Sequence, residues 1–271
     1  MEAVYAVAGE QVVTRPHAAG PWSADMQHGS APASLIAWAI EQIPAPRPMR
    51  VARLTLDLLR PVPVEMLLLQ TRIVRDGRKI QVCEATLLAG QTEVVRASAL
   101  RIRVDRAALP NALPERPSPR DLPDDFPDYG AGPFPSAFLA GVSMRSRHPM
   151  TYHAGPKSIW FRADRPIIEG AAISPFMRAA LTADFCNGTG AVLDPQQWTF
   201  LNADLTVNLA RMPVGDWIRL DAECWMGREG VGLAAGLMAD TSGYFGRAAQ
   251  SLVLEPRGTP SGESSRTFAG Q

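Results

Sequence analysis

The sequence predicts an α+β fold in which two tandem copies of one unit place two long helices on a curved antiparallel sheet. Three observations support this prediction. Strand-like segments recur at a spacing of 151 residues, a helix-like segment precedes the strands in each half, and a proline-rich stretch separates the halves. A chain of 271 residues is long enough for two units that each bury a core.

The two halves of the chain match each other at three places. Residues 54–60 (LTLDLLR) match 205–211 (LTVNLAR), and 96–100 (RASAL) match 247–251 (RAAQS) at the same spacing. Between them, Pro63-Val64 matches Pro213-Val214 after a slip of one residue. Three matches in the same order indicate an internal duplication, and the period is too long for a solenoid repeat.

The duplication divides the chain into four segments. We expect an N-terminal unit over 1–105, a linker over 106–150, a C-terminal unit over 151–256 and a disordered tail over 257–271. Eight prolines lie between Pro110 and Pro135 inclusive. Because proline lacks a backbone N–H and restricts the residue before it, the linker is expected to be an extended connector.

The first unit is predicted to begin with a helix over 30–42. Ser30 is the expected N-cap, Pro32 falls in the first turn, where its missing N–H costs little, and Pro44 ends the helix. Asp76-Gly77 is a hairpin signal. Strands are expected near 1–13 and over 50–60, 66–75, 79–89 and 93–104.

The second unit is predicted to repeat this order. Its helix is expected from about Ser174 to Phe185, and Ser242-Gly243 marks the turn before the last strand. Strands are expected near 157–164, 200–211, 216–226, 230–239 and 244–254.

The composition argues against several classes of function. Lys+Arg and Asp+Glu both total 27, so no net charge draws the chain to nucleic acid. Cys83, Cys186 and Cys224 show no metal-ligand spacing and are expected to be reduced, in a cytoplasmic protein. No N-terminal signal and no apolar run long enough to span a membrane is expected. No G-x-S-x-G motif of a serine hydrolase is present.

Three stretches resemble the thioesterase-like superfamily related to bacterial type-II acyl-CoA thioesterases. They are the His-Gly turn that leads into the first helix (20–35), the segment 183–188 (ADFCNG), and the strand pair 198–207 and 246–253. The resemblance implies a double hotdog fold, with an acyl-CoA bound between the two helices and hydrolysed without metal or cofactor. It also implies a hydrolase of lipid metabolism and a homo-oligomer.

The resemblance implies that a water held by three side chains attacks the thioester. Carried onto this chain, they are Asp184 near the end of the second helix, Asn202 before the strand 204–206, and Gln250 on the last strand. The type-II enzymes more often have threonine at the position of Asn202, so Thr206 is a substitute candidate. A buried aspartate has a raised pKa and can act as the base, and amides can orient a water.

The other half of the chain is expected to supply binding groups and no second catalytic set. The backbone N–H groups of Gly29 and Ser30 at the helix N-terminus can hold a thioester oxygen, and His28 is a candidate contact to the carbonyl or to CoA. At the spacing of 151, Gln250 falls on Ala99 and Asn202 on Val51. One site per chain is therefore expected.

Other interpretations of these residues remain open at this point. Asp184 can be a surface residue or helix cap, and Gln250 can make a structural hydrogen bond on a buried strand face. Another hotdog enzyme such as an enoyl-CoA hydratase is possible, although its Asp with a His five residues later does not match Asp25 and His28. A non-catalytic acyl-ligand-binding protein is the third alternative.

Overall fold

The computed structural model describes residues 1–105, 118–119, 121–130, 135–148 and 154–257. Much of the expected linker and all but the first residue of the expected disordered tail (257–271) lie outside the described residues. Within the described ranges, no helix is both long and apolar enough to cross a membrane.

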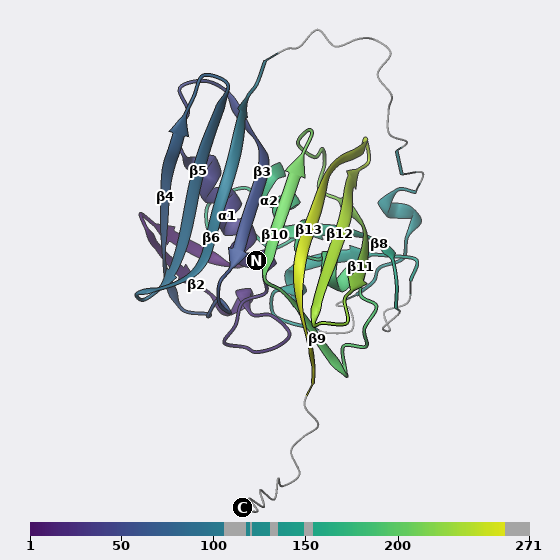
Figure 1. Ribbon diagram of the computed structural model, residues 1–271. Coiled ribbons are helices and arrows are strands. Elements are labelled where there is room, and N and C mark those ends of the chain that lie inside the picture. Colours follow the sequence, from purple (N-terminus) through teal and green to yellow (C-terminus); the bar gives the residue numbers. More distant parts are fainter. Residues whose placement is uncertain (106–117, 120, 131–134, 149–153, 258–271) are drawn as a thin grey trace, which may run out of the picture.

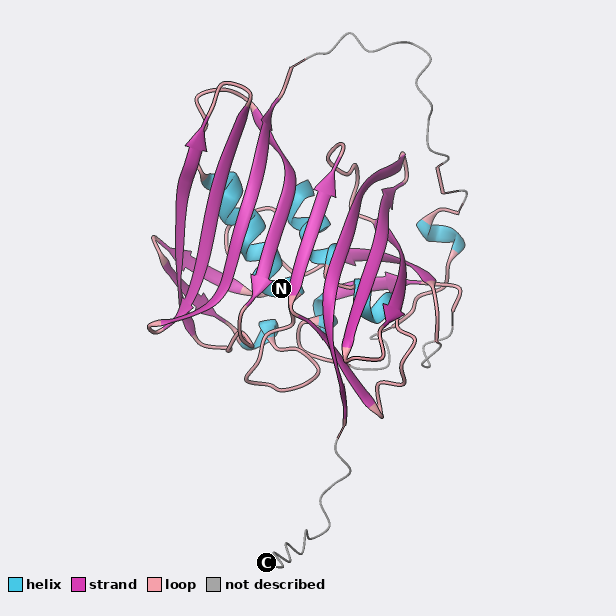
Figure 2. Cartoon of the chain, viewed as in Figure 1, coloured by secondary structure: helices cyan, strands magenta, loops and turns pink. Residues whose placement is uncertain are grey.

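The described strands form one continuous antiparallel sheet, which curves around two helices on one of its faces (Figures 1 and 2). The strand order is β1-β2-β4-β5-β6-β3-β10-β13-β12-β11-β8-β7, and β9 pairs with β13. The strands are β1 (Tyr5–Ala8), β2 (Gln11–Thr14), β3 (Met49–Leu58), β4 (Met66–Asp76), β5 (Ile80–Ala89), β6 (Thr92–Arg103), β7 (Val142–Arg145), β8 (Lys157–Ala163), β9 (Trp198–Asn202), β10 (Asp204–Leu209), β11 (Ile218–Met226), β12 (Val231–Asp240) and β13 (Gly243–Pro256). The helices are α1 (Ser30–Gln42), α2 (Pro175–Ala183) and α3 (Cys186–Thr189), with short 3-10 turns η1 (Pro16–Ala18), η2 (Pro123–Asp125) and η3 (Leu139–Gly141).

The strand register reproduces the internal duplication. β3 and β10 join the two halves at the centre of the sheet, and Thr55 lies directly opposite Thr206, which is 151 residues later. Thr55 pairs with Ser98 in β6, and Thr206 pairs with Ala249 in β13, again at this spacing. The two halves are therefore related by a local two-fold axis that passes between the two threonines.

The two main helices lie side by side and run in opposite directions. Ser30 at the start of α1 bonds Asp184 at the end of α2, and Ser174 at the start of α2 bonds Glu41 near the end of α1. The predicted bounds of α1 are confirmed, but the N-cap is Gly29 and not Ser30. Ser30 is the first helical residue, and its hydroxyl is used across the helix pair instead of capping its own helix.

The second helix is shorter than predicted. Ser174 is its N-cap, and its hydroxyl accepts a hydrogen bond from the backbone N–H of Met177. The helix ends at Ala183 after 9 residues. Asp184 is the C-cap, and the chain turns there before the short helix α3.

Two predicted strands are each divided in the structure. The N-terminal strand near 1–13 is a hairpin of β1 and β2 that turns at Gly9, where φ is 61°. The strand predicted over 200–211 breaks at Ala203 into β9 and β10. It breaks because β13 is 14 residues long and pairs with β10 along its first half and with β9 along its second half.

Part of the segment assigned to the linker packs into the core. β7 pairs with β8 at one edge of the sheet, and Phe138, Leu139, Val142 and Met144 are buried. Regular structure therefore extends into 106–150, where the proline content predicts only an extended connector. The division of the chain into units and linker stays a prediction.

The junction of β3 and β10 should stabilise both halves together. Leu205 is fully buried there, so Leu205→Ala should lower the free energy of unfolding by about 2–5 kcal/mol. Leu59→Ala, at a half-exposed position, is the matched control and should change it by less than about 0.5 kcal/mol. Urea unfolding followed by circular dichroism should show one transition that moves to lower urea. Two separate transitions would contradict the shared core.

Candidate active site

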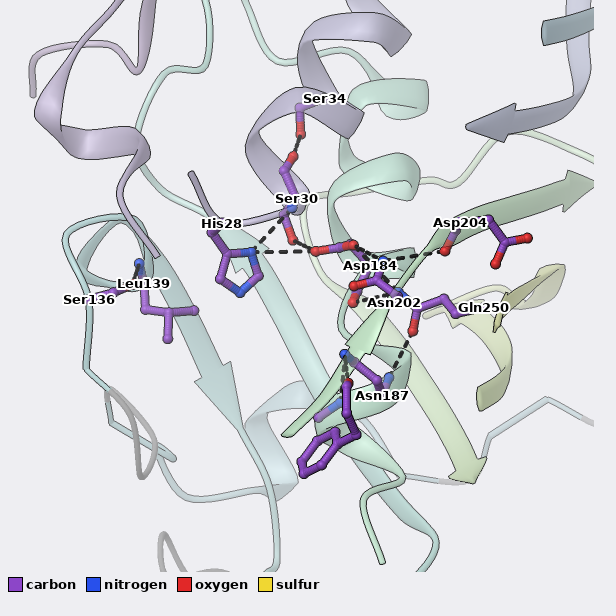
Figure 3. A network of polar contacts seen from close by, with 12 residues as sticks. His28, Ser30, Ser34, Ser136, Leu139, Asp184, Asn187, Asn202, Asp204 and Gln250 are labelled. Carbon is purple, nitrogen blue, oxygen red and sulfur yellow. Dashed lines mark hydrogen bonds and ion pairs between the residues drawn. The ribbon is translucent and has the colours of Figure 1, made fainter. Parts of the chain in front are cut away.

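Polar side chains from both halves meet where α1 begins and α2 ends (Figure 3). Asp184 lies at the centre of this network and is only 4% exposed. Its Oδ2 accepts a hydrogen bond from the Ser30 hydroxyl at 3.0 Å, and its Oδ1 accepts one from Asn202 Nδ2 at 3.0 Å. Gln250 Nε2 approaches the same Oδ1 at 3.4 Å. The predicted residues Asp184, Asn202 and Gln250 are therefore brought together.

Gln250 holds the backbone around Asp184. It is 1% exposed on β13, and its Nε2 donates to the main-chain oxygen of Asp184 at 3.0 Å. Its Oε1 accepts the backbone N–H of Asn187 at 2.9 Å. Both ends of the amide are thus engaged, and they fix the turn between α2 and α3.

Asn202 lies at the end of β9, just before the break at Ala203. Its Nδ2 is shared between Asp184 Oδ1 and the main-chain oxygen of Asp204, which is 3.3 Å away. Its Oδ1 has no hydrogen-bond partner among the described residues, and the side chain lines a cavity. This oxygen is free to accept a hydrogen bond from a bound molecule.

His28 lies against the other carboxylate oxygen. Its Nδ1 accepts the backbone N–H of Ser30 at 3.2 Å and is 3.5 Å from Asp184 Oδ2. The ring stacks on Phe138 at 5.0 Å and also contacts Phe185. Burial lowers the pKa of His28 to about 4, so the ring is neutral at pH 7 and the contact with Asp184 is not an ion pair. Because Nδ1 accepts a hydrogen bond, the proton is assigned to Nε2.

The charge of Asp184 is not matched by a cation among the described residues. Burial raises its pKa to about 6, while hydrogen bonds from Ser30 and Asn202 act in the opposite direction. The carboxyl group therefore changes charge near neutral pH, which suits a general base.

Gly29 makes room for this carboxylate. A Cβ at this position would lie 2.7 Å from Asp184 Oδ1 and 2.8 Å from Oδ2. The glycine permits the close approach of Asp184, whereas the sequence analysis assigns this turn to holding a thioester oxygen. The backbone N–H of Ser30 is already bonded to His28, so it is not free for a thioester oxygen.

Thr206, the substitute candidate, does not join the network. Its hydroxyl bonds that of Thr55 at 3.3 Å on the two-fold axis. Leu205 and Val207 are buried on the helix side, so alternation along β10 directs Thr206 to the opposite face of the sheet. Thr206 therefore lies outside the cluster around Asp184, and the proposal below assigns it no role in the reaction.

A cavity of about 390 Å³ opens beside Asp184. Its wall is mainly apolar and aromatic, and Asp184, Asn202 and His28 lie in it. Tyr129, Leu139 and Met144 also line it, although the sequence places them in the linker. The signal that could have found them is the apolar alternation around Val142–Arg145, which the nearby prolines obscure.

No group of three or more His, Cys, Asp and Glu side chains within the described ranges could hold a metal ion. The three cysteines are free and buried. Burial raises the pKa of Cys224 to about 12, so this thiol stays protonated. Asp184, with a pKa of about 6, is a group in the cavity wall that can take up a proton at neutral pH.

Comparison with solved structures shows a hotdog fold. A conserved protein of unknown function with this fold from Alicyclobacillus acidocaldarius is 16% identical over 93% of this chain and 95% of that chain, with a TM-score of 0.70. Acyl-CoA thioesterase II TesB2 from Mycobacterium marinum is 17% identical over 88% of this chain and 91% of that chain (TM-score 0.64). The tesB protein of Mycobacterium avium subs paratuberculosis is 17% identical over 92% of this chain and 94% of that chain, with a TM-score of 0.62.

Comparison with curated proteins gives no match. Family models match both halves of the sequence. Residues 18–102 match the acyl-CoA thioesterase N-terminal domain, and residues 110–254 match the acyl-CoA thioesterase C-terminal domain. With the fold and the residues around Asp184 described, these matches show that the chain belongs to the acyl-CoA thioesterase family.

Proposed function

We propose that this protein hydrolyses an acyl-CoA to the free acid and CoA, at one site in each double-hotdog chain. The observation that carries the proposal is a buried carboxyl group with a pKa of about 6 in the wall of an apolar cavity. A thioester hydrolase needs a base that is ionised at neutral pH, a cavity for an acyl group and a donor for the carbonyl oxygen.

The carboxylate of Asp184 activates the attacking water. Asn202 and Gln250 donate to Oδ1, and Ser30 donates to Oδ2, so an acceptor position on Oδ2 remains. A water bonded there and to the free Oδ1 of Asn202 is oriented by two acceptors. Its proton passes to Asp184 as its oxygen bonds to the thioester carbon.

His28 stabilises the oxygen that becomes negative. With Nδ1 occupied, its Nε2–H is the donor that the ring can offer, and His28 lines the cavity. The neutral ring acts as a hydrogen-bond donor, and the aromatic side chains beside it exclude water. When the C–S bond breaks, the thiolate leaves as CoA and takes up the proton held by Asp184.

Gln250 acts on the water through Asp184. Its amide is bonded to Asp184 and Asn187 and does not line the cavity. We therefore assign it as a positioning residue, whereas the family resemblance implies direct contact with the water. Its counterpart Ala99 and the counterpart of Asn202, Val51, are apolar, which supports one site per chain.

Two further expectations remain proposals. Buried free cysteines suit a reducing compartment such as the cytoplasm. A homo-oligomer acting in lipid metabolism follows from the family resemblance.

Removing the base should abolish hydrolysis and leave the fold intact. Asp184→Asn should lower kcat/KM for acyl-CoA by about 10²–10⁴-fold, measured as free thiol release. Asp216→Asn, at an exposed ion pair with Arg178, is the matched control and should retain the wild-type rate. No thiol release by the wild-type protein from acyl-CoAs of any chain length would contradict the proposed function and favour a non-catalytic ligand-binding protein.

The same substitution should not destabilise the protein at pH 8. The folded-state pKa of Asp184 is raised, so its contribution to stability is full below about pH 4 and is lost as the pH rises through about 6. Asp184→Asn removes this buried charge, and its Tm at pH 8 should equal or exceed that of the wild type. A large drop in Tm would show that the carboxylate holds the helix pair together.

The rate should depend on one ionisation at moderately acid pH. Because Asp184 must be ionised, kcat/KM should fall about tenfold per pH unit below about pH 6 and stay level above it. His28, with a pKa of about 4, adds no second step in this range. Thiol release followed with a dithiodipyridine reagent provides the profile, and a rate independent of pH would contradict Asp184 as the base.

Asn202 should influence the pH below which kcat/KM falls. Its hydrogen bond favours the ionised form of Asp184. Asn202→Ala should therefore raise the pH below which kcat/KM falls, and it should also lower the pH-independent value of kcat/KM above that pH. Asn208→Ala, on an exposed position of β10, is the matched control. A lower kcat/KM that still falls below the same pH as in the wild type would show that Asn202 does not act through the carboxylate.

A further inference from the structure

An arginine directly after the last strand borders the same cavity as Asp184. Arg257 follows the end of β13, is exposed to solvent and lines the cavity. It is the first residue of the tail that the sequence predicts to be disordered, and it lies beyond the family match, which ends at residue 254. The proposed hydrolysis assigns no role to Arg257.

Two hydrogen bonds hold Arg257 against the turn before β9. Its backbone N–H donates to the main-chain oxygen of Gln197 at 2.7 Å, and its Nε donates to that of Pro195 at 2.7 Å. Its terminal nitrogens, Nη1 and Nη2, have no partner among the described residues. Asp194 in the same turn and Glu255 on the same strand form no ion pair with it there. The guanidinium group is thus fixed at one edge and offers the other edge to an anion, and such a fork matches the geometry of a phosphate.

The separation between Arg257 and the proposed base follows from the length of β9. Asn202, which bonds Asp184, lies at one end of β9, and Trp198 at the other end is paired with Pro256, directly before Arg257. The four steps from Trp198 to Asn202 span about 13 Å, and Arg257 is one residue further on. In CoA about thirteen bonds separate the sulfur from the first phosphorus, or about 15 Å at the reach of an extended chain. A sulfur beside Asp184 therefore brings the diphosphate of CoA near Arg257.

The side of the cavity along β9 can take the pantetheine arm of CoA. Trp198, Phe200 and Asn202 share one face of β9, and all three line the cavity. Gln196 and Leu201 also line it and are exposed, so this side opens to solvent. An arm that leads from a buried thioester to a solvated diphosphate needs such an open side.

The acyl group is then left with the other side of the cavity. Leu139 lies on the opposite side of Asp184 from Asn202 (Figure 3). Leu139 and Met144 are buried and line the cavity. Met144 is paired across the strands with Phe161, which also lines it. These apolar side chains suit an acyl chain and offer nothing to a charged group.

We propose that Arg257 binds the diphosphate of CoA, so that the pantetheine arm runs along β9 and the acyl chain lies against Leu139 and Met144. The inference rests on the proposed acyl-CoA hydrolysis. The contact is remote from the reacting bond and does not change during the reaction, so it lowers KM and leaves kcat unchanged. It makes the protein select CoA thioesters over thioesters of carriers that lack a phosphate.

Thioesters that share an acyl group and differ in the carrier test this inference by kinetics. Octanoyl-CoA, octanoyl-3′-dephospho-CoA and octanoyl-pantetheine are compared by free thiol release. Arg257→Gln should raise KM about tenfold for the two carriers with a diphosphate, as expected for a charged hydrogen bond, with kcat unchanged. Arg257→Lys should restore part of the difference, because lysine keeps the charge without the fork. For octanoyl-pantetheine, kcat/KM of Arg257→Gln should equal that of the wild type, which also shows that the variant is folded.

The matched control is another arginine that does not border the cavity. Arg228 is exposed in the turn between β11 and β12. Arg228→Gln removes the same charge from the surface and should leave KM for all three thioesters at the wild-type value.

Binding measured without hydrolysis gives a second readout. Isothermal titration calorimetry with CoA, 3′-dephospho-CoA and pantetheine measures Kd for each carrier. The wild type should bind CoA and 3′-dephospho-CoA more tightly than pantetheine, and Arg257→Gln should weaken the binding of these two alone. Higher ionic strength should narrow the difference between the carriers, because salt screens a charged contact at the surface.

The outcomes separate this inference from the proposed function. Equal losses for all three thioesters in Arg257→Gln, or an unchanged KM for each, would overturn the inference and leave the hydrolysis standing. An effect that disappears with the 3′-dephospho carriers would assign Arg257 to the 3′-phosphate and overturn the placement of the diphosphate. Binding of CoA that depends on Arg257, without hydrolysis of any thioester, would support this inference and contradict the proposed function.

Discussion

The carboxylate of Asp184 lies where the start of α1 meets the end of α2, and its charge is balanced by neutral donors alone. Ser30 comes from the first half of the chain, and Asn202 and Gln250 come from the second. Burial without a cation raises the pKa of Asp184 to about 6. The same close packing requires a residue without a side chain at Gly29. A lysine or arginine beside Asp184 would hold its pKa low and make it a weaker base, so the absence of a cation near it in the described structure serves the chemistry.

The duplicated fold explains where such a group can arise. Antiparallel helices related by a local two-fold axis create two similar junctions, each with a serine hydroxyl bonded to a carboxylate: Ser30 with Asp184, and Ser174 with Glu41. The serine–carboxylate pair is thus a feature of the helix packing. What distinguishes the first junction is the pair of amides that surrounds its carboxylate. Glu41 is an exposed residue, whereas Asp184 is almost fully buried. The duplication supplies the frame, and the difference between the copies supplies the site.

Sequence reasoning identifies the residues whose position depends on order along the chain. The offset between Leu54 and Leu205 reappears in the strand register, and Asp184, Asn202 and Gln250 meet as expected. Errors arise where position depends on contacts with distant segments. Thr206 looks suitable beside Asn202, but the break at Ala203 and the pairing with β13 decide which face it occupies. Ser30 resembles an N-cap because its neighbours in sequence suggest one, whereas its actual partner is 154 residues away.

The two parts of the cavity place different demands on a substrate. At Asp184 the interactions change during the reaction, because a proton is gained and negative charge grows on the carbonyl oxygen near His28, so these residues act mainly on kcat. Contacts between the apolar wall and an acyl chain are the same before and during the reaction, because no bond in that part of the substrate changes. Such uniform binding lowers KM without raising kcat. Selectivity between acyl chains would therefore appear at low substrate concentration and disappear at saturation.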